Sequence, residues 1–222
     1  MCGRFSQAQV AELDREVFKL LEMPALEPRY NVAPTQPAAV VRGTQDGARE
    51  MALLRWGLIP HWARDPAMGA RLINARAETA ESKPSFRDSF RSRRCLVPAD
   101  GFYEWQKTPH GKQPYYLRRN DGRVLAFAGL WDRWRDPERG PVDTFTILTT
   151  EPNDLVRPVH ARMPVILPEQ AYDRWLNPRA GARDLRALLV PYRADEMDAY
   201  PVSTYVNSPR NEGPECVQPQ HA

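Results

Sequence analysis

The chain has 222 residues, of which 42% are hydrophobic and 27% charged, and these values predict one soluble globular domain spanning 1–222. Its net charge of +3 is too small to indicate a nucleic-acid partner by itself. No apolar run is long enough to cross a membrane, and the N-terminus lacks the apolar core of a signal peptide. We therefore expect a cytosolic protein with no membrane partner.

The cysteines and histidines argue against two kinds of stabilising site. Cys2, Cys95 and Cys216 form no CxxC pair, and the four histidines are scattered along the chain. We therefore expect neither a disulfide framework nor a metal site, and Cys95 and Cys216 are expected to be buried as small apolar residues. The sequence has neither a GxGxxG nor a GxxxxGK[ST] motif, so no nucleotide cofactor is expected.

The first predicted element is a helix. Ser6 and Gln9 fit a capping box, and apolar residues recur after them at helical spacing. These apolar residues are Val10, Leu13, Val17 and Leu20. The pattern predicts a helix that begins at Ser6 and ends before Pro24.

Most of the remaining predicted elements are short strands. Apolar runs bounded by turn residues predict strands at 37–41, 51–59, 71–75, 95–106, 114–119, 124–131, 144–150, 163–167 and 198–204. Helices are expected at 85–94, 168–176 and 182–190. In the first of these helices, Phe86 and Phe90 share one face, and Arg87, Arg91 and Arg94 are expected to form a solvated one. The loop at 107–113 joins two strands, and segments 42–50 and 132–143 are assigned no role.

The order of these elements indicates the fold class. Strands dominate the middle of the chain, helices flank them, and no regular alternation of strand and helix is present. We therefore predict an α+β protein with a mixed, largely antiparallel sheet or barrel-like core and peripheral helices.

The first three residues, Met1, Cys2 and Gly3, can give rise to an unusual reactive group. Removal of Met1 leaves an α-amine beside a thiol, with ordinary pKa values of roughly 7.7–8.0 and about 8.5, so both nucleophiles are expected to be partly available near neutral pH. Such a 1,2-aminothiol condenses with an aldehyde to form a thiazolidine ring. From this dipeptide alone, however, an N-terminal cysteine with no role is the favoured interpretation.

Two further segments place polar groups on one face of an extended chain. In INARAET (73–79), period two puts Asn74 and Arg76 on the same side, where they suit a sugar oxygen and a phosphate. A strand-end Asn and a surface Arg explain the pattern equally well. In GFYEW (101–105), Glu104 lies among aromatic residues, which favours a raised pKa and acid/base work over an exposed rim position.

The segment VHARMP (159–164) would place His160 and Arg162 on one face if it were extended. A histidine can move a proton and an arginine can neutralise a phosphate, although a single histidine is more often structural. Trp56, Trp62 and Trp105 offer aromatic faces on which bases can stack, while core packing is the alternative for several of the tryptophans.

Taken together, the segments resemble the SRAP (SOS response-associated peptidase) family. The resemblance runs through MCGRF (1–5), RYNVAPTQ (29–36), WGLIPHWA (56–63), NARAET (74–79), ADGFYEW (99–105), VHARMP (159–164) and SPRNEGPECVQP (208–219), in the family's order. It implies the SRAP fold over the whole chain and covalent trapping of abasic sites in single-stranded DNA.

The resemblance also implies roles for individual residues. Cys2 is similar to the family's nucleophile, Asn74 to the residue that orients the reacting sugar, Glu104 to the acid/base, and His160 to its partner at the sugar oxygen. The DNA-binding positions are Gly3, Arg4, Asn74, Arg76, Trp105 and Arg162; of these, Arg4, Arg76 and Arg162 match positions that hold phosphates, and Trp105 matches a base-stacking position. The resemblance implies a monomer that needs no cofactor and gathers on damaged DNA in the nucleoid.

Three other functions remain open at this stage. An N-terminal-nucleophile amidohydrolase uses the same amine and thiol, although this chain lacks an accompanying synthase domain. An autopeptidase that acts only on its own Met1 is a narrower form of that reading. A single-stranded DNA binding module without chemistry would bind intact and abasic strands equally and reversibly.

Overall fold

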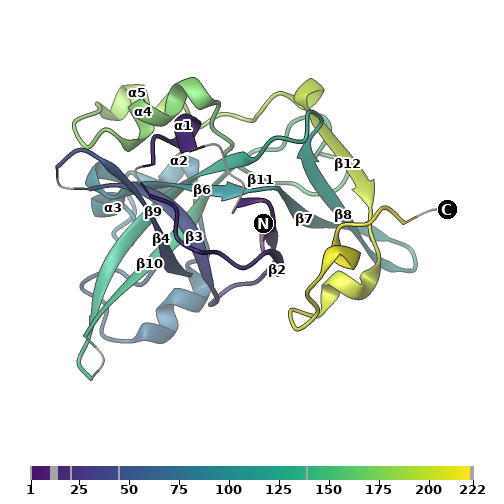
Figure 1. The fold of residues 1–222 in the computed structure, drawn as a ribbon, viewed down its shortest axis with the longest axis horizontal. Helices are drawn as coiled ribbons and strands as arrows, with labels where there is room; N and C mark the ends of the chain where they lie inside the picture. The colour runs from purple at the N-terminus through teal and green to yellow at the C-terminus, as the bar shows by residue number, and fades with distance from the viewer. Residues whose placement is uncertain (1, 11–14, 21, 45, 139, 221–222) are drawn as a thin grey trace.

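The computed structural model describes residues 2–10, 15–20, 22–44, 46–138 and 140–220 (Figure 1). Its strands are β1 (Phe5–Gln7), β2 (Arg29–Val32), β3 (Pro37–Gly43), β4 (Arg49–Trp56), β5 (Asn74–Arg76), β6 (Arg94–Ala99), β7 (Gly101–Thr108), β8 (Gly111–Arg119), β9 (Leu125–Asp136), β10 (Gly140–Thr150), β11 (Met163–Pro164) and β12 (Met197–Pro201). Its α-helices are α1 (Arg15–Phe18), α2 (Ala77–Ala80), α3 (Arg87–Ser92), α4 (Tyr172–Leu176) and α5 (Ala182–Arg186). The 3₁₀ helices are η2 (Pro66–Arg71), η3 (Glu169–Ala171), η4 (Ala194–Glu196), η5 (Thr204–Asn207) and η6 (Pro214–Cys216).

One of the two sheets closes on itself. Its strands follow the order β10-β4-β3-β6-β9, and β9 pairs again with β10, while β5 and β11 add to β10. The pairings of β10 with β4 and with β5 are parallel, and the other pairings are antiparallel. The prediction of an α+β fold with a largely antiparallel, barrel-like core is therefore confirmed.

The second sheet carries the N-terminal strand. Its order is β12-β8-β7-β1-β2, so β1 lies between β7 and β2 and all pairings are antiparallel. In Figure 1, β7, β8 and β12 lie on one side of the molecule and the closed sheet on the other, with β2 between them. This arrangement brings the start of the chain to the junction of the two sheets.

Side-chain alternation divides the core into two clusters. Val40, Trp56 and Phe127 point into the interior of the barrel that the closed sheet forms, where they pack with other large side chains of its strands. Their neighbours in sequence, such as Val41 and Ala128, point outward and pack against helices α1, α3, α4 and α5. The two-residue period of the strands thus fills the barrel and at the same time binds the helices to its outer surface (Figure 1).

The prediction of a helix beginning at Ser6 is wrong. Phe5–Gln7 form strand β1, and the Ser6 hydroxyl lies 2.7 Å from the Tyr116 hydroxyl, where it cannot cap a helix. The Asp100 carboxylate instead accepts hydrogen bonds from the backbone N–H groups of Ala8 and Gln9, at 2.6 and 3.0 Å. A helix does form further on, at Arg15–Phe18, whereas the predicted helix position Leu13 lies outside the described residues.

The strand expected at 51–59 ends early, at Trp56. Gly57 follows with φ of +123°, a conformation that favours glycine, and a Cβ there would lie 2.6 Å from the Gly69 carbonyl oxygen. The strand expected at 71–75 begins only at Asn74, because Pro66–Arg71 form a 3₁₀ helix.

Other strand boundaries differ from the prediction, mainly because strands run further into the hairpins than expected. Segments 42–50 and 132–143 lie largely in the β3–β4 and β9–β10 hairpins, and the predicted loop at 107–113 shrinks because β7 continues to Thr108 and β8 begins at Gly111. Residues 95–106 form two strands, β6 and β7, and only two residues of the strand expected at 163–167 form β11. Arg94 is buried at the start of β6, so it does not belong to the solvated face that Arg87 and Arg91 form.

Candidate active site

Cys2 lies at the junction of the two sheets and is completely buried. It packs in the same cluster as Phe5 of β1 and Phe102 of β7. Burial, followed by the nearby negative charge of Glu104, raises the pKa of the Cys2 thiol. The expectation that this thiol is partly ionised near neutral pH is therefore wrong, because the dipeptide gives no sign of how deeply the fold buries it.

Asn74 reaches Cys2 from the closed sheet. Strand β5 pairs in parallel with β10, and Ala75 is fully buried, so Asn74 and Arg76 share the opposite face as the alternation predicts. The Asn74 Nδ2 donates a hydrogen bond to the Cys2 carbonyl oxygen at 2.8 Å. Its Oδ1 is also buried and accepts no hydrogen bond within the described ranges, which leaves an acceptor beside Cys2.

Glu104 comes from β7, in the other sheet, and only 3% of it is exposed. Burial raises its pKa to about 7, which confirms the expectation for a carboxyl group enclosed by aromatic side chains. The alternation of β7 is also as predicted, since Tyr103 and Trp105 pack together on the face opposite Phe102. Both the protonated and the ionised form of Glu104 are therefore populated near neutral pH.

His160 lies beside Glu104, with its Nδ1 3.7 Å from the Glu104 Oε1. Burial lowers the pKa of His160, which favours the neutral imidazole. The segment is not extended, because residues 154–159 form turns and the backbone N–H of Arg162 donates to the His160 Nδ1 at 3.1 Å. This contact fixes the position of the imidazole ring.

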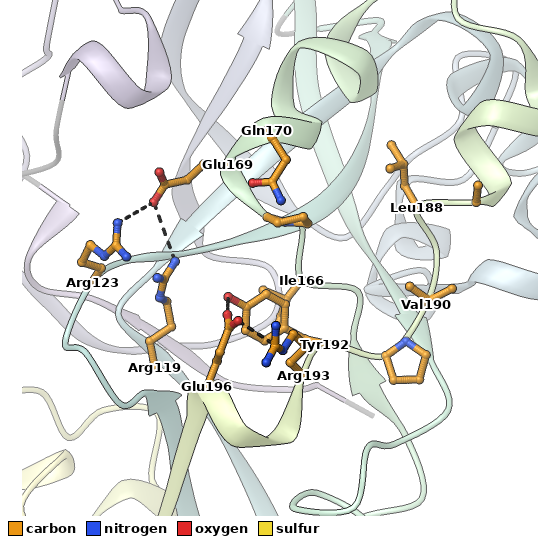
Figure 2. A pocket seen from close by; sticks show the side chains of 13 residues that line it. Arg119, Arg123, Ile166, Glu169, Gln170, Leu188, Val190, Tyr192, Arg193 and Glu196 are labelled. Atoms are coloured by element: carbon orange, nitrogen blue, oxygen red, sulfur yellow. Dashed lines mark hydrogen bonds and ion pairs between the residues drawn. The ribbon is translucent and has the colours of Figure 1, made fainter.

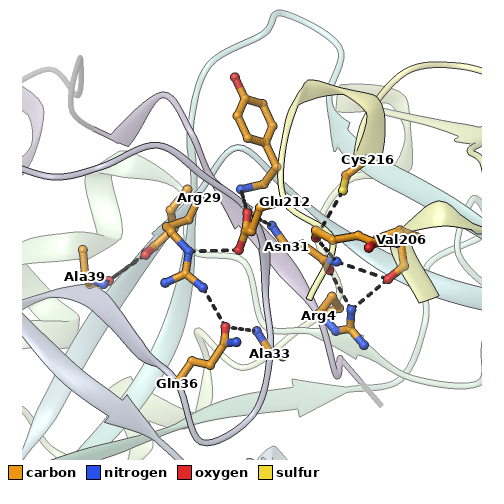
Figure 3. Close-up of polar contacts among 12 residues, drawn as sticks. Arg4, Arg29, Asn31, Ala33, Gln36, Ala39, Val206, Glu212 and Cys216 are labelled. Atoms are coloured by element: carbon orange, nitrogen blue, oxygen red, sulfur yellow. Dashed lines mark hydrogen bonds and ion pairs between the residues drawn. The ribbon is translucent and has the colours of Figure 1, made fainter. Parts of the chain in front are cut away.

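Arg4 is held by protein groups on the far side of the junction (Figure 3). Its Nη1 donates to the Asn31 Oδ1 at 2.7 Å and to the Val206 carbonyl oxygen at 2.8 Å. Its guanidinium also lies 5.8 Å from the centre of the Trp105 ring, and the Trp105 Nε1 donates to the Asn207 Oδ1 at 2.7 Å. Arg4 and Trp105 are thus both attached to the C-terminal segment.

The other predicted DNA-binding residues surround the same junction. Gly3 is half-buried beside Cys2, and Arg76 is exposed at the end of β5. Arg162 is ion-paired with Glu78, which belongs to the NARAET segment. Trp62 is exposed, but Trp56 is fully buried and donates from its Nε1 to the Ile73 carbonyl oxygen, so Trp56 is a core residue with no face available for stacking.

Sequence reasoning missed the side chains that support this site. Asn31, Glu78 and Glu212 lie in segments that the sequence analysis singled out, and Asn207 directly precedes one, but none received a role. Their partners in these contacts lie between 27 and 182 positions away in the sequence, and a single sequence gives no signal for such pairings.

A separate cavity of about 430 Å³ lies away from the four predicted catalytic side chains (Figure 2). Its lining includes Ile166, Leu188 and Val190, and its arginines are paired with neighbouring carboxylates, as in the Arg123–Glu169 contact of 3.2 Å. None of the predicted site residues lines it. This cavity therefore does not coincide with the predicted site.

Neither a membrane-spanning helix nor a cluster of metal-binding side chains appears in the described part of the chain. No helix there has the length and apolarity needed to cross a bilayer. Groups of three or more His, Cys, Asp or Glu side chains in metal-binding arrangements are also absent from the described residues.

Comparison with known proteins defines the class to which this fold and site belong. The model of the SOS response associated peptidase (SRAP) family matches residues 1–209, and the chain therefore belongs to the SRAP family. The abasic site processing protein YoqW of Bacillus subtilis is 45% identical, over 98% of this chain and 99% of its own length. The abasic site processing protein HMCES of Gallus gallus is 35% identical, over 86% of this chain and 66% of its own length.

Solved structures show the same architecture. A crystal structure of a Bacteroides thetaiotaomicron protein has a TM-score of 0.85 and 30% identity, and the match covers 99% of this chain and 100% of that chain. A Bordetella bronchiseptica protein has a TM-score of 0.80 and 34% identity, over 91% of this chain and 100% of that chain. The fold is thus shared across the full length of these relatives.

Proposed function

We propose that this chain, as one domain spanning 1–222, processes abasic sites in single-stranded DNA by forming a covalent crosslink through Cys2. The abasic-site processing named for its relatives supports the general activity. The observation that carries the finer proposal is the convergence of Cys2, Asn74, Glu104 and His160, which come from separate parts of the chain. The protein would act as a monomer on damaged DNA in the cytoplasm and nucleoid.

The reaction begins after hydrolysis has removed Met1 and freed the α-amine of Cys2. The abasic deoxyribose opens when its C1′ hydroxyl loses a proton and its ring oxygen gains one, which gives an aldehyde. The amine adds to the aldehyde carbon and water leaves, forming an imine. The thiol sulfur then adds to the imine carbon while the nitrogen takes up a proton, so one C–N and one C–S bond close a thiazolidine ring.

Glu104 is the candidate for two proton transfers in this reaction, to the sugar ring oxygen and from the Cys2 thiol. With a pKa of about 7, its protonated form can donate a proton to the ring oxygen of the sugar, and its ionised form can accept the proton of the Cys2 thiol. Such a base is needed because burial keeps that thiol protonated. His160 would assist at the sugar oxygen as a neutral imidazole, and the Asn74 Oδ1 offers an acceptor for a sugar hydroxyl.

DNA binding would rest on backbone contacts and stacking. Arg4, Arg76 and Arg162 would contact phosphates, Gly3 would lie against the strand, and Trp105 would stack on a base. Because phosphate contacts and stacking tolerate any sequence, affinity should fall with added salt and show no strong base preference.

The rival hydrolytic functions make different predictions. An amidohydrolase would hydrolyse glutamine and be labelled by a glutamine-analogue electrophile, whereas the proposed function predicts neither. If the chain removes Met1 itself, protein expressed in cells without methionine aminopeptidase activity will still lack that residue when its intact mass is measured.

The direct test uses a single-stranded oligonucleotide with one abasic site. Met1-processed protein should form a covalent adduct that survives a denaturing gel. Cys2→Ala should abolish it, because an imine on the remaining terminal amine has no thiol with which to close a stable ring and hydrolyses. An undamaged oligonucleotide of the same sequence is the control and should give no adduct. An undiminished adduct with Cys2→Ala would move the nucleophile to another residue.

A further inference from the structure

The guanidinium of Arg162, a predicted phosphate contact, is already occupied by a carboxylate. Its Nη1 donates to the Glu78 Oε1 at 2.6 Å, and its Nη2 donates to the Glu78 Oε2 at 2.9 Å. In this end-on geometry the two terminal nitrogens each bind one oxygen, and a guanidinium can bind a phosphate group in the same way. Glu78 therefore fills the positions on Arg162 that two oxygens of a DNA phosphate would take.

Glu78 also faces the second predicted phosphate contact on this side of the site. It lies two residues after Arg76, where strand β5 gives way to helix α2, and the hydrogen bond to Arg162 together with the charges of Arg162 and Arg76 lowers its pKa. About half of the Glu78 side chain is exposed, so an incoming strand can reach and displace it.

Arg162 keeps a second anchor that is independent of Glu78. Its Nη2 also donates to the Thr149 carbonyl oxygen at 2.6 Å, and only 19% of its side chain is exposed. Loss of the Glu78 charge would therefore leave the guanidinium near its present position, and its positive charge would no longer be neutralised by a carboxylate.

Resting on the proposed function, we propose that Glu78 is an internal competitor of the DNA backbone. Its carboxylate occupies the phosphate-binding side of Arg162 and weakens reversible binding to undamaged single strands. Abasic strands are retained nonetheless, because the covalent bond to Cys2 does not depend on that contact. Because of Glu78, the selection of damaged over undamaged DNA depends less on the affinity of reversible binding and more on the covalent reaction.

Glu78→Gln tests this proposal, because it keeps the shape of the side chain and removes its charge. The variant should bind an undamaged single-stranded oligonucleotide roughly three- to tenfold more tightly at low salt, since Arg162 then gains a full phosphate contact. The slope of log affinity against log salt concentration should steepen by about 0.7, the value for one added contact on a single strand.

Glu81→Gln is the matched control. Glu81 follows helix α2 directly and makes a comparable ion pair with the exposed Arg186 at 2.9 Å, so its substitution changes the net charge equally but leaves Arg162 untouched. It should leave the salt slope unchanged. In an Arg162→Gln background, Glu78→Gln should lose its effect on affinity, because the two side chains act as one pair.

The possible outcomes separate this inference from the proposed function. If Glu78→Gln binds like Glu81→Gln, or more weakly than the wild type, Glu78 does not compete with DNA and the inference is overturned. That result would leave the proposed function intact as long as the wild-type protein still crosslinks abasic strands. Failure of the wild-type protein to crosslink would overturn the proposed function itself.

Discussion

Glu104 is a carboxyl group in a position where an ionised carboxylate is costly. Almost none of it is exposed, and burial raises its pKa to about 7. If it transfers protons during crosslinking, Glu104→Gln should slow both formation and reversal of the adduct, by roughly 10²–10⁴-fold for loss of a general acid/base. Time courses on denaturing gels would measure both rates, and unchanged rates would remove Glu104 from the mechanism.

The same burial predicts an effect of pH on stability. Below pH 4.5, the ordinary value for this group, Glu104 is protonated in both the folded and the unfolded state and has no effect on the free energy of unfolding. Between pH 4.5 and about 7 only the unfolded state releases the proton, so stability falls, and above pH 7 the loss is constant. This difference corresponds to on the order of 3 kcal/mol.

Glu104→Gln should therefore be more stable than the wild type at pH 8 and close to it at pH 5. Urea denaturation of both proteins at the two pH values would measure the difference. A stability difference that is the same at both pH values would contradict a raised pKa for Glu104.

At the scale of the elements, the buried side chain of Asn31 holds the C-terminal segment against β2 (Figure 3). The Asn31 Nδ2 lies within hydrogen-bonding distance of the carbonyl oxygens of Val206, Ser208 and Asn211, at 3.2, 3.0 and 2.8 Å. Glu212 then accepts hydrogen bonds from the backbone N–H groups of Tyr30 and Asn31, which covers the exposed edge of β2.

Asn31→Ala should destabilise the protein by about 2–4 kcal/mol, because buried carbonyl groups and Arg4 lose their partner. Limited proteolysis should also cut residues 203–219 faster, and urea denaturation would give the energy. Asn177→Ala is the control, since Asn177 is exposed and its side chain accepts only a local bond from the Arg179 N–H. Equal effects of the two substitutions would show that Asn31 does not hold the segment.

Local patterns in the sequence predicted most of the elements of this fold. The alternation of apolar and polar residues predicted most strands close to their observed positions. It also placed Asn74 and Arg76 on one face of a strand, and Phe102 and Tyr103 on opposite faces of another. The failures occurred where a distant residue decides the local structure. Asp100, rather than Ser6, accepts the hydrogen bonds from the Ala8 and Gln9 N–H groups, where Ser6 was expected to cap a helix.

The candidate site divides in the same way. The resemblance of several motifs to the SRAP family indicated Cys2, Asn74, Glu104 and His160, whereas the residue types alone favoured a role only for Glu104. The sequence could not indicate that the Cys2 thiol is buried, or that Glu78 pairs with Arg162, because both depend on packing between segments that are far apart in the chain.

At the scale of the whole molecule, the junction of the two sheets brings the proposed catalytic residues together. The closed sheet supplies Asn74 through β5, the other sheet supplies Glu104 through β7, and β1 brings Cys2 between them. Because the site is assembled around the start of the chain, any residue that remains in front of Cys2 blocks the amine on which the proposed reaction depends.

Mass spectrometry of the crosslinked peptide tests this account most directly. After reaction with an abasic single strand, nuclease digestion and cleavage after Phe5, the peptide spanning 2–5 should carry the sugar remnant, with the mass of one water lost on condensation. An adduct on a lysine-containing peptide, or an unmodified N-terminal peptide that still begins with Met1, would contradict it.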